Sequence, residues 1–451
     1  MKVHAGPVSL ARSGSPAGPD PYFPGQGNGG YDAQHYAIDL SVDPADNYIT
    51  GSTTMQARAT QDLESFNLDL KGLRVAEVKV DRELATIERD GDELHITPAH
   101  PLAEGQPFEV VVNYSGRPKP VPGPSFPAPT GWIHHDQGSF VVSQPNGAST
   151  WYPVNDHPAD KATYSFHLTV PKPFMGVANG SLIRTVDLGD HTTYHWEARD
   201  PMASYLSTVL IGEFEPVDQA GSVPIRHYFA PELSDEVKAP HLRSPEMIDF
   251  FSQRLGDYPF DGFGSAVVNV PFRGALETQT LPVYGSASTH RENPELVVAH
   301  ELAHQWFGDS VSVEAWKDIW LNEGFATYAS WLWLEHSQGQ QAFNDTLRGA
   351  YEHIQRAPLG APIADPGPAG ILMPQVYLRG ALCLHALRLE VGDHAFFDIL
   401  KTHLAAHRNS NAATADFEQT ASQVSGQDLS TLFTPWLHAL DLPPYPRSGT
   451  H

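Results

Sequence analysis

The sequence contains two histidines and two glutamates whose spacing suits a metal-dependent hydrolase. His300, Glu301 and His304 lie together in the segment His-Glu-Leu-Ala-His, and Glu323 follows the second histidine after eighteen residues. On a helix, residues four apart lie one turn above the other, so both imidazoles can bind one metal ion. Two histidines and a glutamate leave one position of a tetrahedral zinc ion for water, and Glu301 stands beside that water as a general base.

Two apolar segments are expected to position these groups as helices. Residues 295–307 contain neither proline nor glycine and stop at Gly308. Residues 320–334 are also apolar, with large aromatic side chains at helical spacing, which we interpret as the packing of a buried helix rather than a binding stripe. A chance match on a surface helix is the alternative for the metal motif, and the correctly spaced Glu323 argues against it.

The stretch 298–328 resembles the aminopeptidase N family of zinc metallopeptidases, whose pattern is HExxH, eighteen residues and a glutamate in a WLNEGFA-type segment. Here residues 320–326 read Trp-Leu-Asn-Glu-Gly-Phe-Ala. Gly-Ala-Leu-Glu-Thr at 274–278 stands where the family has its GAMEN signature, and Val-Tyr-Leu-Arg-Gly at 376–380 stands where it has a tyrosine before a lysine–glycine pair. Further segments are similar, at 151–162 and 200–206, so the resemblance covers nearly the whole chain.

The resemblance implies substrate-binding roles for the segment at 274–278. Glu277 would hold the free α-ammonium group of a peptide through a charge-assisted hydrogen bond of about 1.5–3 kcal/mol, which favours removal of the N-terminal residue. Gly274 and Ala275 would present backbone polar groups to an extended substrate. Leu276 and Thr278 stand where the family usually has Met and Asn, so the preferred substrate side chain stays open.

A second implied contact to the substrate lies in the N-terminal half of the chain. Gln144 and Asn146 match a position where the family often has Gln-x-Glu, which helps to grip the amine and the first residue. Asn146 accepts a hydrogen bond but carries no charge. Glu277 is therefore expected to anchor the amine nearly alone.

The resemblance also implies a residue that stabilises the tetrahedral intermediate. Tyr377 would direct its phenol at the developing oxyanion, a contribution of about a hundred- to a thousand-fold in rate for such donors. Arg379 replaces the lysine that is usual in the family, and because it keeps the charge we expect little change. Asn322 and Thr327 are hypothesised to orient the zinc ligands, since Thr327 lies one turn beyond Glu323.

The implied activity is that of a zinc-dependent aminopeptidase with one Zn²⁺ ion, acting on peptides with a free N-terminal amine. Zinc held by His300, His304 and Glu323 would lower the pKa of its water to about 7, and Glu301 would take the proton as water attacks the first peptide carbonyl. The alternative is a thermolysin-like zinc endopeptidase, which would cleave N-blocked peptides. A leukotriene-type epoxide hydrolase would need a lipid pocket, and a non-catalytic peptide-binding module would be expected to have lost Glu301 or a ligand.

The spacing of apolar residues divides the chain near residue 216. Before it, they alternate in twos at 36–42, 108–114 and 164–170, as in antiparallel strands. After residue 240 the period is helical, and Ser244 before a proline is expected to cap the first helix. We therefore predict an α+β protein with an N-terminal antiparallel β-domain over 1–216, a saddle or sandwich. A mostly helical catalytic domain, thermolysin-like by the resemblance, would occupy 217–451.

Composition limits the partners that this chain can take. With 53 acidic and 28 basic residues, the formal net charge of −25 argues against nucleic acid and anionic membranes. The single cysteine, Cys383, excludes an internal disulfide and is expected to be a buried apolar residue.

The ends of the chain carry two further expectations. We recognise no signal peptide in the first thirty residues and no stretch long enough to span a membrane, so a cytoplasmic location is expected. Larger family members continue into a helical C-terminal domain, whereas this chain ends soon after Pro446, so a more open cleft is expected. The oligomeric state is not predicted.

Overall fold

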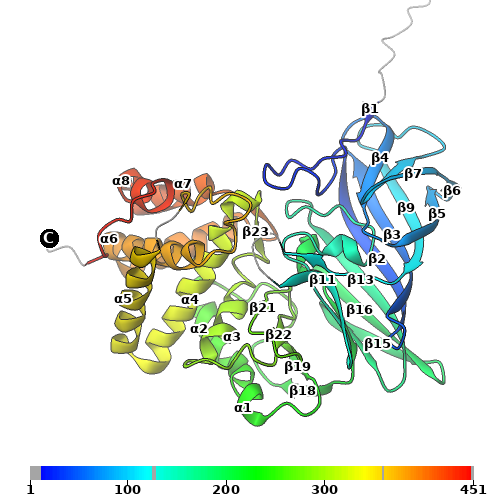
Figure 1. Ribbon diagram of the computed structural model, residues 1–451. Coiled ribbons are helices and arrows are strands. Elements are labelled where there is room, and N and C mark those ends of the chain that lie inside the picture. The colour runs from blue at the N-terminus through cyan, green and yellow to red at the C-terminus, as the bar shows by residue number, and fades with distance from the viewer. Residues whose placement is uncertain (1–11, 124–127, 358–359, 448–451) are drawn as a thin grey trace, which may run out of the picture.

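The computed structural model describes residues 12–123, 128–357 and 360–447. Figure 1 shows a β-rich N-terminal part, blue to green, beside a mostly helical part, green to red. The predicted α+β class, with a β-domain followed by a helical catalytic region, is confirmed. The first eleven residues of the predicted N-terminal domain lie outside the described part of the chain.

An eight-stranded sheet forms the largest layer of the N-terminal part. Side chains along its strands alternate between buried and exposed, as the period of two predicts. Neighbouring strands are antiparallel except β2 and β13, which pair in parallel because the intervening chain crosses over before it returns beside β2. The order is β15 (Ser181–Asp187), β16 (His191–Met202), β13 (Ala162–Pro171), β2 (Tyr31–Asp43), β3 (Tyr48–Ala59), β9 (Pro107–Gly116), β5 (Arg74–Val80) and β6 (Glu83–Leu84).

Two smaller sheets complete the N-terminal part. One contains, in order, β1 (Arg12–Ser13), β4 (Leu63–Asp69), β8 (Glu93–Thr97) and β7 (Thr86–Asp90). The other contains β10 (Val121–Pro122), β11 (Pro129–His135), β12 (Gly138–Val142), β17 (Val209–Gly212) and β14 (Met175–Ala178). Phe140 of β12 stacks on Phe272 of the following part with ring centroids 5.8 Å apart, so this second sheet packs against the catalytic region.

A five-stranded sheet begins the catalytic region. Its order is β18 (Glu215–Gln219), β19 (Ile225–Phe229), β20 (Ala266–Val268), β22 (Val283–Gly285) and β21 (Ala275–Leu276). The predicted strand at 266–270 is therefore two residues shorter than expected. β18 crosses the predicted boundary at residue 216 and pairs with β19. The domain limits of 1–216 and 217–451 stay a prediction.

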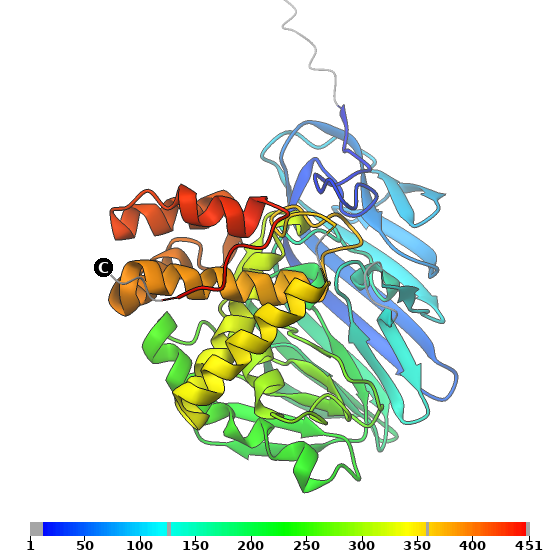
Figure 2. The ribbon, with the colours of Figure 1, turned by 60° about the vertical axis from the view of Figure 1, so that its left-hand side comes forward.

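Helices make up most of the remaining chain. They are α1 (Asp235–Lys238), α2 (Ser244–Leu255), α3 (Glu295–Ala303), α4 (Trp320–Gln338), α5 (Gln340–Arg356), α6 (Pro374–Ala406), α7 (Thr414–Ser425) and α8 (Ser430–Phe433). Short 3-10 or π turns occur at Ala148–Thr150, Ser204–Leu206, His241–Arg243, Trp316–Asp318 and Thr434–His438. Two short strands, β23 (Val311–Val313) and β24 (Ser410–Ala412), pair in parallel. Figure 2 shows α7 and α8, in red, alongside α6, in orange.

Two predicted helix ends differ from the structure. Ser244 is not a cap but the first residue of α2, because the 3-10 turn before it already supplies backbone acceptors, and its hydroxyl donates to the His241 carbonyl at 2.6 Å. α3 ends at Ala303 rather than near residue 307, since the amides of Gln305 and Trp306 bond to carbonyls three residues back. The chain then turns at Gly308, where φ is +121°.

The core of the helical region is built as predicted around α4. Every residue from Trp320 to Leu334 is buried, and α4 packs against both α3 and α6. Cys383 of α6 is fully buried, as expected for an apolar residue. Across the described ranges, no helix combines the length and the apolar character that a membrane crossing requires.

Candidate active site

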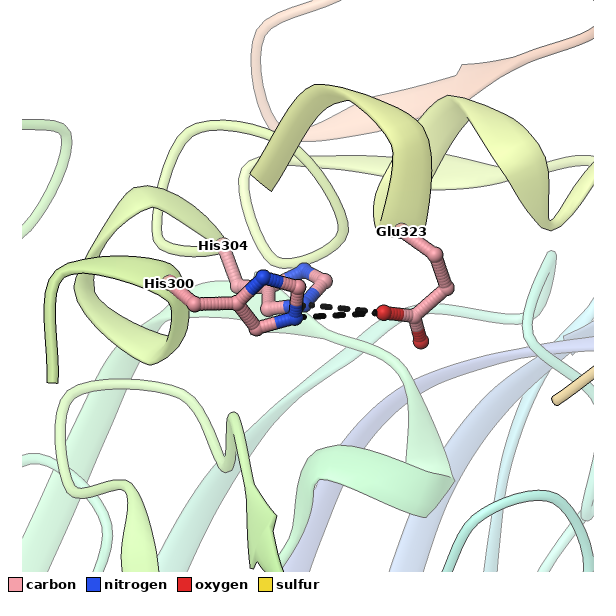
Figure 3. A group of neighbouring side chains, drawn as sticks. All are labelled: His300, His304 and Glu323. Carbon is pink, nitrogen blue, oxygen red and sulfur yellow. Dashed lines mark hydrogen bonds and ion pairs between the residues drawn. The ribbon is translucent and has the colours of Figure 1, made fainter. Parts of the chain in front are cut away.

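Two neighbouring helices bring the predicted metal ligands together. His300 lies on α3, His304 caps its C-terminus, and Glu323 lies in the first turn of α4 (Figure 3). Glu323 Oε2 is 3.3 Å from each imidazole Nε2, and the two Nε2 atoms are 3.0 Å apart. A zinc ion with bonds of about 2.0–2.1 Å to three tetrahedral ligands places them about 3.3–3.4 Å apart. The three ligand atoms therefore fit a tetrahedral zinc site.

Hydrogen bonds to the far side of each ring orient the imidazoles. His304 Nδ1 lies 2.9 Å from the Phe307 carbonyl oxygen, which can only accept, so this nitrogen carries the proton and Nε2 keeps its lone pair for a metal. His300 Nδ1 lies 3.5 Å from Thr327 Oγ1, in keeping with the hypothesis for Thr327. Asn322 instead donates to the Tyr205 hydroxyl at 3.2 Å, so its amide reaches a neighbour of the site rather than an imidazole.

Of the three candidate ligands, His300 has the most exposed side chain. The side chain of His300 is 16% exposed, whereas those of His304 and Glu323 are 1% and 2% exposed. His304 and Glu323 are therefore shielded from water, and His300 is the ligand that water reaches most readily. In such an environment electrostatic interactions are strong.

Buried carboxyl groups outnumber the cations that could balance them. Burial raises the pKa of Glu301 to about 8 and that of Glu277 to about 7, although the nearby His304 opposes both shifts. Burial would also raise the pKa of Glu323, but the two imidazoles lower it to about 2. For His304, burial is outweighed by the surrounding carboxylates, which raise its pKa well above the usual value. A divalent cation here would favour the ionised carboxylates and neutral imidazoles.

Glu277 lies next to the general-base candidate rather than at a distance from it. Single ligand atoms of Glu277, Glu301 and His304 all lie within 4.8 Å of one another. Gln144, which follows β12, donates from Nε2 to Glu277 Oε1 at 3.4 Å, so a residue of the N-terminal part reaches the site. Asn146 is only partly buried, and its Oδ1 has no hydrogen-bond partner among the described residues. The structure therefore brings Gln144, but not Asn146, to the Glu277 carboxylate.

The segment before Glu277 forms the edge of the catalytic sheet. Among the described strands, β21 pairs only with β22, and it lies beside α3. The Gly285 amide donates to the Gly274 carbonyl at 3.3 Å, so the alternation of an antiparallel pair turns the amide and carbonyl of Ala275 to the free edge. Leu276 is 5% exposed. Gly274 and Ala275 thus stand where an added strand would bind.

Tyr377 reaches the metal ligands because two helices approach closely. Its ring stacks on that of His300, with centroids 5.9 Å apart and planes at 17°. It lies in the first turn of α6, and a Cβ atom on Gly324 of α4 would come within 2.9 Å of Gly380 Cα, so any larger residue there would push α6 and α4 apart. Burial and the neighbouring Glu323 raise the pKa of Tyr377 well above its usual value, so its hydroxyl keeps its proton and can donate.

Three residues near the site had no role assigned from the sequence. Tyr205 is fully buried. Its hydroxyl accepts a hydrogen bond from the Asn322 amide and donates one to the Glu277 carboxylate. Gln305 donates to the Glu277 carbonyl at 3.3 Å and accepts from the Thr280 amide at 2.8 Å, which ties α3 to the anchor segment. The only sequence signals were the similar segment at 200–206 for Tyr205 and the position of Gln305 directly after the HExxH motif.

Asp309 is the third of these residues. It is fully buried, and neither carboxylate oxygen has a hydrogen-bond partner among the described residues. Burial and the nearby Glu277 raise its pKa well above the usual value. His304 and the ammonium of Lys161, which donates to the Asp309 and Ser310 carbonyls at 2.7 and 3.0 Å, oppose this shift.

Arg379 not only keeps the positive charge, as expected, but also makes several hydrogen bonds to the backbone. It is 1% exposed and lies two residues after Tyr377. Its guanidinium donates to five backbone carbonyls at 2.7–3.0 Å, those of Pro435, Trp436, Ala439, Leu440 and Asp441. A lysine has three donors on one nitrogen and cannot bond to all five. The expectation that this replacement changes little stays a prediction, and the five contacts argue against it.

Comparison with known proteins gives a consistent family assignment for both parts. Residues 275–436 match the Peptidase family M1 domain, and residues 32–206 match the Peptidase M1 N-terminal domain. Aminopeptidase 2 of Candida albicans is 25% identical over 440 residues, which cover 91% of this chain and 47% of that protein. Probable aminopeptidase 1 of Sulfurisphaera tokodaii is 26% identical over 411 residues, which cover 83% and 49%. The chain spans about half the length of these relatives.

Solved structures of similar length also match. The crystal structure of an M1 zinc metallopeptidase from Deinococcus radiodurans has a TM-score of 0.89 at 31% identity, and the match covers 95% of this chain and 99% of that one. A mutant M1 zinc metallopeptidase from the same organism, bound to a Tyr-Ser-Ala substrate, has a TM-score of 0.88 with the same identity and coverage.

Proposed function

This chain belongs to peptidase family M1, and on that premise we propose that it is a zinc-dependent aminopeptidase. The observation that carries the proposal is the short distance between the amine anchor and the reacting centre. Single ligand atoms of Glu277, Glu301 and His304 lie within 4.8 Å of one another. One residue of extended chain spans about 3.3–3.6 Å. A peptide whose ammonium is held by Glu277 therefore has room for one residue before the bond that is cut.

His300, His304 and Glu323 would hold one Zn²⁺ ion, as their mutual distances of 3.0–3.3 Å support. When bound, zinc acidifies a water molecule and polarises the substrate carbonyl. Both imidazoles must be neutral to act as ligands, and the Phe307 carbonyl orients His304 for this role. The burial of Glu323 also favours metal binding.

The remaining chemistry falls to side chains around the ligands. Glu301, 6% exposed, accepts the proton of the attacking water and passes it to the departing nitrogen. Tyr377 keeps its proton and donates a hydrogen bond to the developing oxyanion. Glu277 pairs with the substrate ammonium, and Gln144 donates a hydrogen bond to the Glu277 carboxylate. The outward amide and carbonyl of Ala275 bind the substrate backbone.

A thermolysin-like endopeptidase is the alternative, and it would share the zinc ligands. An endopeptidase must accommodate several residues before the cut bond. Glu277 and Gln144 stand on that side of the reacting centre and hydrogen bond to each other. A blocked, uncharged N-terminus would leave the buried Glu277 carboxylate without its cation, which is costly.

A panel of aminoacyl fluorogenic amides, with and without N-acetylation, tests the proposal. The unmodified chain should cleave the free-amine compounds, lose activity with 1,10-phenanthroline and regain it with Zn²⁺. Glu277→Gln should lower kcat/KM on free amines by about ten- to a hundred-fold, the worth of a charge-assisted hydrogen bond. Glu236→Gln removes an exposed carboxylate of α1 and serves as the control. Equal cleavage of N-acetylated and free peptides would favour the endopeptidase.

The cytoplasmic location expected from the sequence stays a prediction, as do the exclusion of nucleic acid and membranes as partners and the openness of the site.

A further inference from the structure

A substrate whose ammonium is bound by Glu277 must extend away from the reacting centre along the edge of the catalytic sheet. With its ammonium at Glu277, an extended peptide runs antiparallel to β21, past Ala275 and Gly274. Extended chain advances about 3.3 Å per residue, so three substrate residues span about 10 Å and the four steps from Glu277 to Arg273 about 13 Å. The C-terminal end of a tripeptide therefore comes close to Arg273.

A fixed guanidinium stands at that end of β21. Arg291 donates from Nη2 to the Arg273 carbonyl at 3.0 Å and from Nε to the Ser288 carbonyl at 3.1 Å. These two bonds hold the side chain against the residue that precedes Gly274. An arginine has five N–H donors, so three remain for a ligand. Arg273 and Arg291 are both exposed, so a substrate can reach them.

The position of Arg291 would also offset the negative charge that repels a substrate carboxylate. The chain has a formal net charge of −25, and the reacting centre holds the buried carboxyl groups of Glu277, Glu301 and Glu323. The carboxylate of a short peptide is repelled by such surroundings. The charge of Arg291 acts on both His300 and Glu301, which places this cation within electrostatic reach of the reacting centre.

We propose that Arg291, with Arg273 beside it, forms a carboxylate-binding subsite for the third residue of the substrate. The ligand is a carboxylate at that position, either the C-terminus of a tripeptide or an acidic side chain in a longer peptide. The subsite rests on the proposed aminopeptidase function, because Glu277 sets the substrate's direction. It would make the enzyme favour short or acidic peptides despite its own acidic character. The competing explanation is that Arg291 has only a structural role, in which its hydrogen bonds connect the turn at Ser288 to Arg273.

Matched substrates separate these explanations. Steady-state kinetics at low ionic strength would compare Ala-Ala-Ala with Ala-Ala-Ala-amide, and Ala-Ala-Asp-Ala-amide with its Asn counterpart, to distinguish the two sources of the carboxylate. The unmodified enzyme should prefer the charged member of at least one pair by about three- to tenfold in kcat/KM, mainly through KM, as for an exposed arginine–carboxylate pair. Arg291→Gln should abolish that preference and Arg291→Lys should retain most of it. Arg184→Gln, an exposed charge change on β15, is the control.

Each outcome decides the matter. If Arg291→Gln slows charged and amide substrates equally, or if the unmodified enzyme shows no preference in either pair, the subsite is refuted while the aminopeptidase function stands. If the zinc-loaded enzyme cleaves neither Ala-Ala-Ala nor its amide, the proposed function fails first. A preference in the tripeptide pair alone assigns the subsite to the C-terminal carboxylate, and one in the Asp/Asn pair assigns it to side chains.

Discussion

Replacing Arg379 by Met is expected to destabilise the fold and to slow catalysis, although Arg379 does not contact the substrate. Arg379 is a positioning residue, because its guanidinium joins the first turns of α6, which carry Tyr377, to the backbone of residues 435–441. Without it, α6 loses its hydrogen bonds to the backbone of residues 435–441. The phenol of Tyr377 then has more freedom above His300.

The size of the effect follows from which carbonyls water can reach. Leu440 is 54% exposed, so the carbonyls of residues 439–441 can exchange the guanidinium for water at small cost. Trp436 is 5% exposed, and its carbonyl would stay buried without a donor, whereas Pro435 is half-buried. An unsatisfied buried acceptor costs about 1–3 kcal/mol, so the loss of the donor to the Trp436 carbonyl gives about 1–3 kcal/mol for Arg379→Met. Arg379→Lys keeps the charge and up to three donors, and should cost about 1–2 kcal/mol.

Guanidinium-induced unfolding followed by circular dichroism at pH 7.5 measures these differences, with Arg184→Met as the exposed control. The order of stability should be unmodified chain, then lysine variant, then methionine variant. The kcat of both Arg379 variants should fall while their zinc content and KM stay near normal. A loss below about 1 kcal/mol for Arg379→Met, or an Arg379→Lys variant that is as unstable as Arg379→Met, would show that the five carbonyl contacts do not stabilise the fold as argued.

Three further substitutions test the site and the fold. Glu301→Gln should retain one zinc per chain by atomic absorption but lose about 100- to 10,000-fold in kcat, and near-normal turnover would remove it as general base. Tyr377→Phe should lower kcat by about 100- to 1000-fold with little change in KM; an unaltered kcat would exclude its role at the oxyanion. Burial lowers the pKa of His403 to about 4, so the unfolded state binds more protons between pH 6.5 and 4 and stability is lost as pH falls through that window. Relative to the unmodified chain, His403→Leu should therefore gain roughly 2 kcal/mol between pH 7.5 and 5, and a pH-independent difference would contradict this.

The sequence alone was sufficient where chemistry depends on local spacing. His300 and His304 share a helical face because of the 3.6-residue period, and the buried run from Trp320 to Leu334 predicts the helix that presents Glu323. The strands of the N-terminal sheet follow equally from alternation in twos. These features are set by residues within a turn or two of one another, which is why they can be predicted without the fold.

Only the tertiary structure decided which distant side chains meet at the site. Gln144, Glu277 and Tyr205 come from separate segments, and nothing in their spacing fixes that Gln144 and Tyr205 both contact the Glu277 carboxylate. The same holds for the five carbonyls around Arg379 and for the parallel pairing of β2 with β13. Such contacts depend on how sheets and helices pack after they form. Packing is governed by the shape and burial of whole surfaces, and a local pattern of residue types does not encode it.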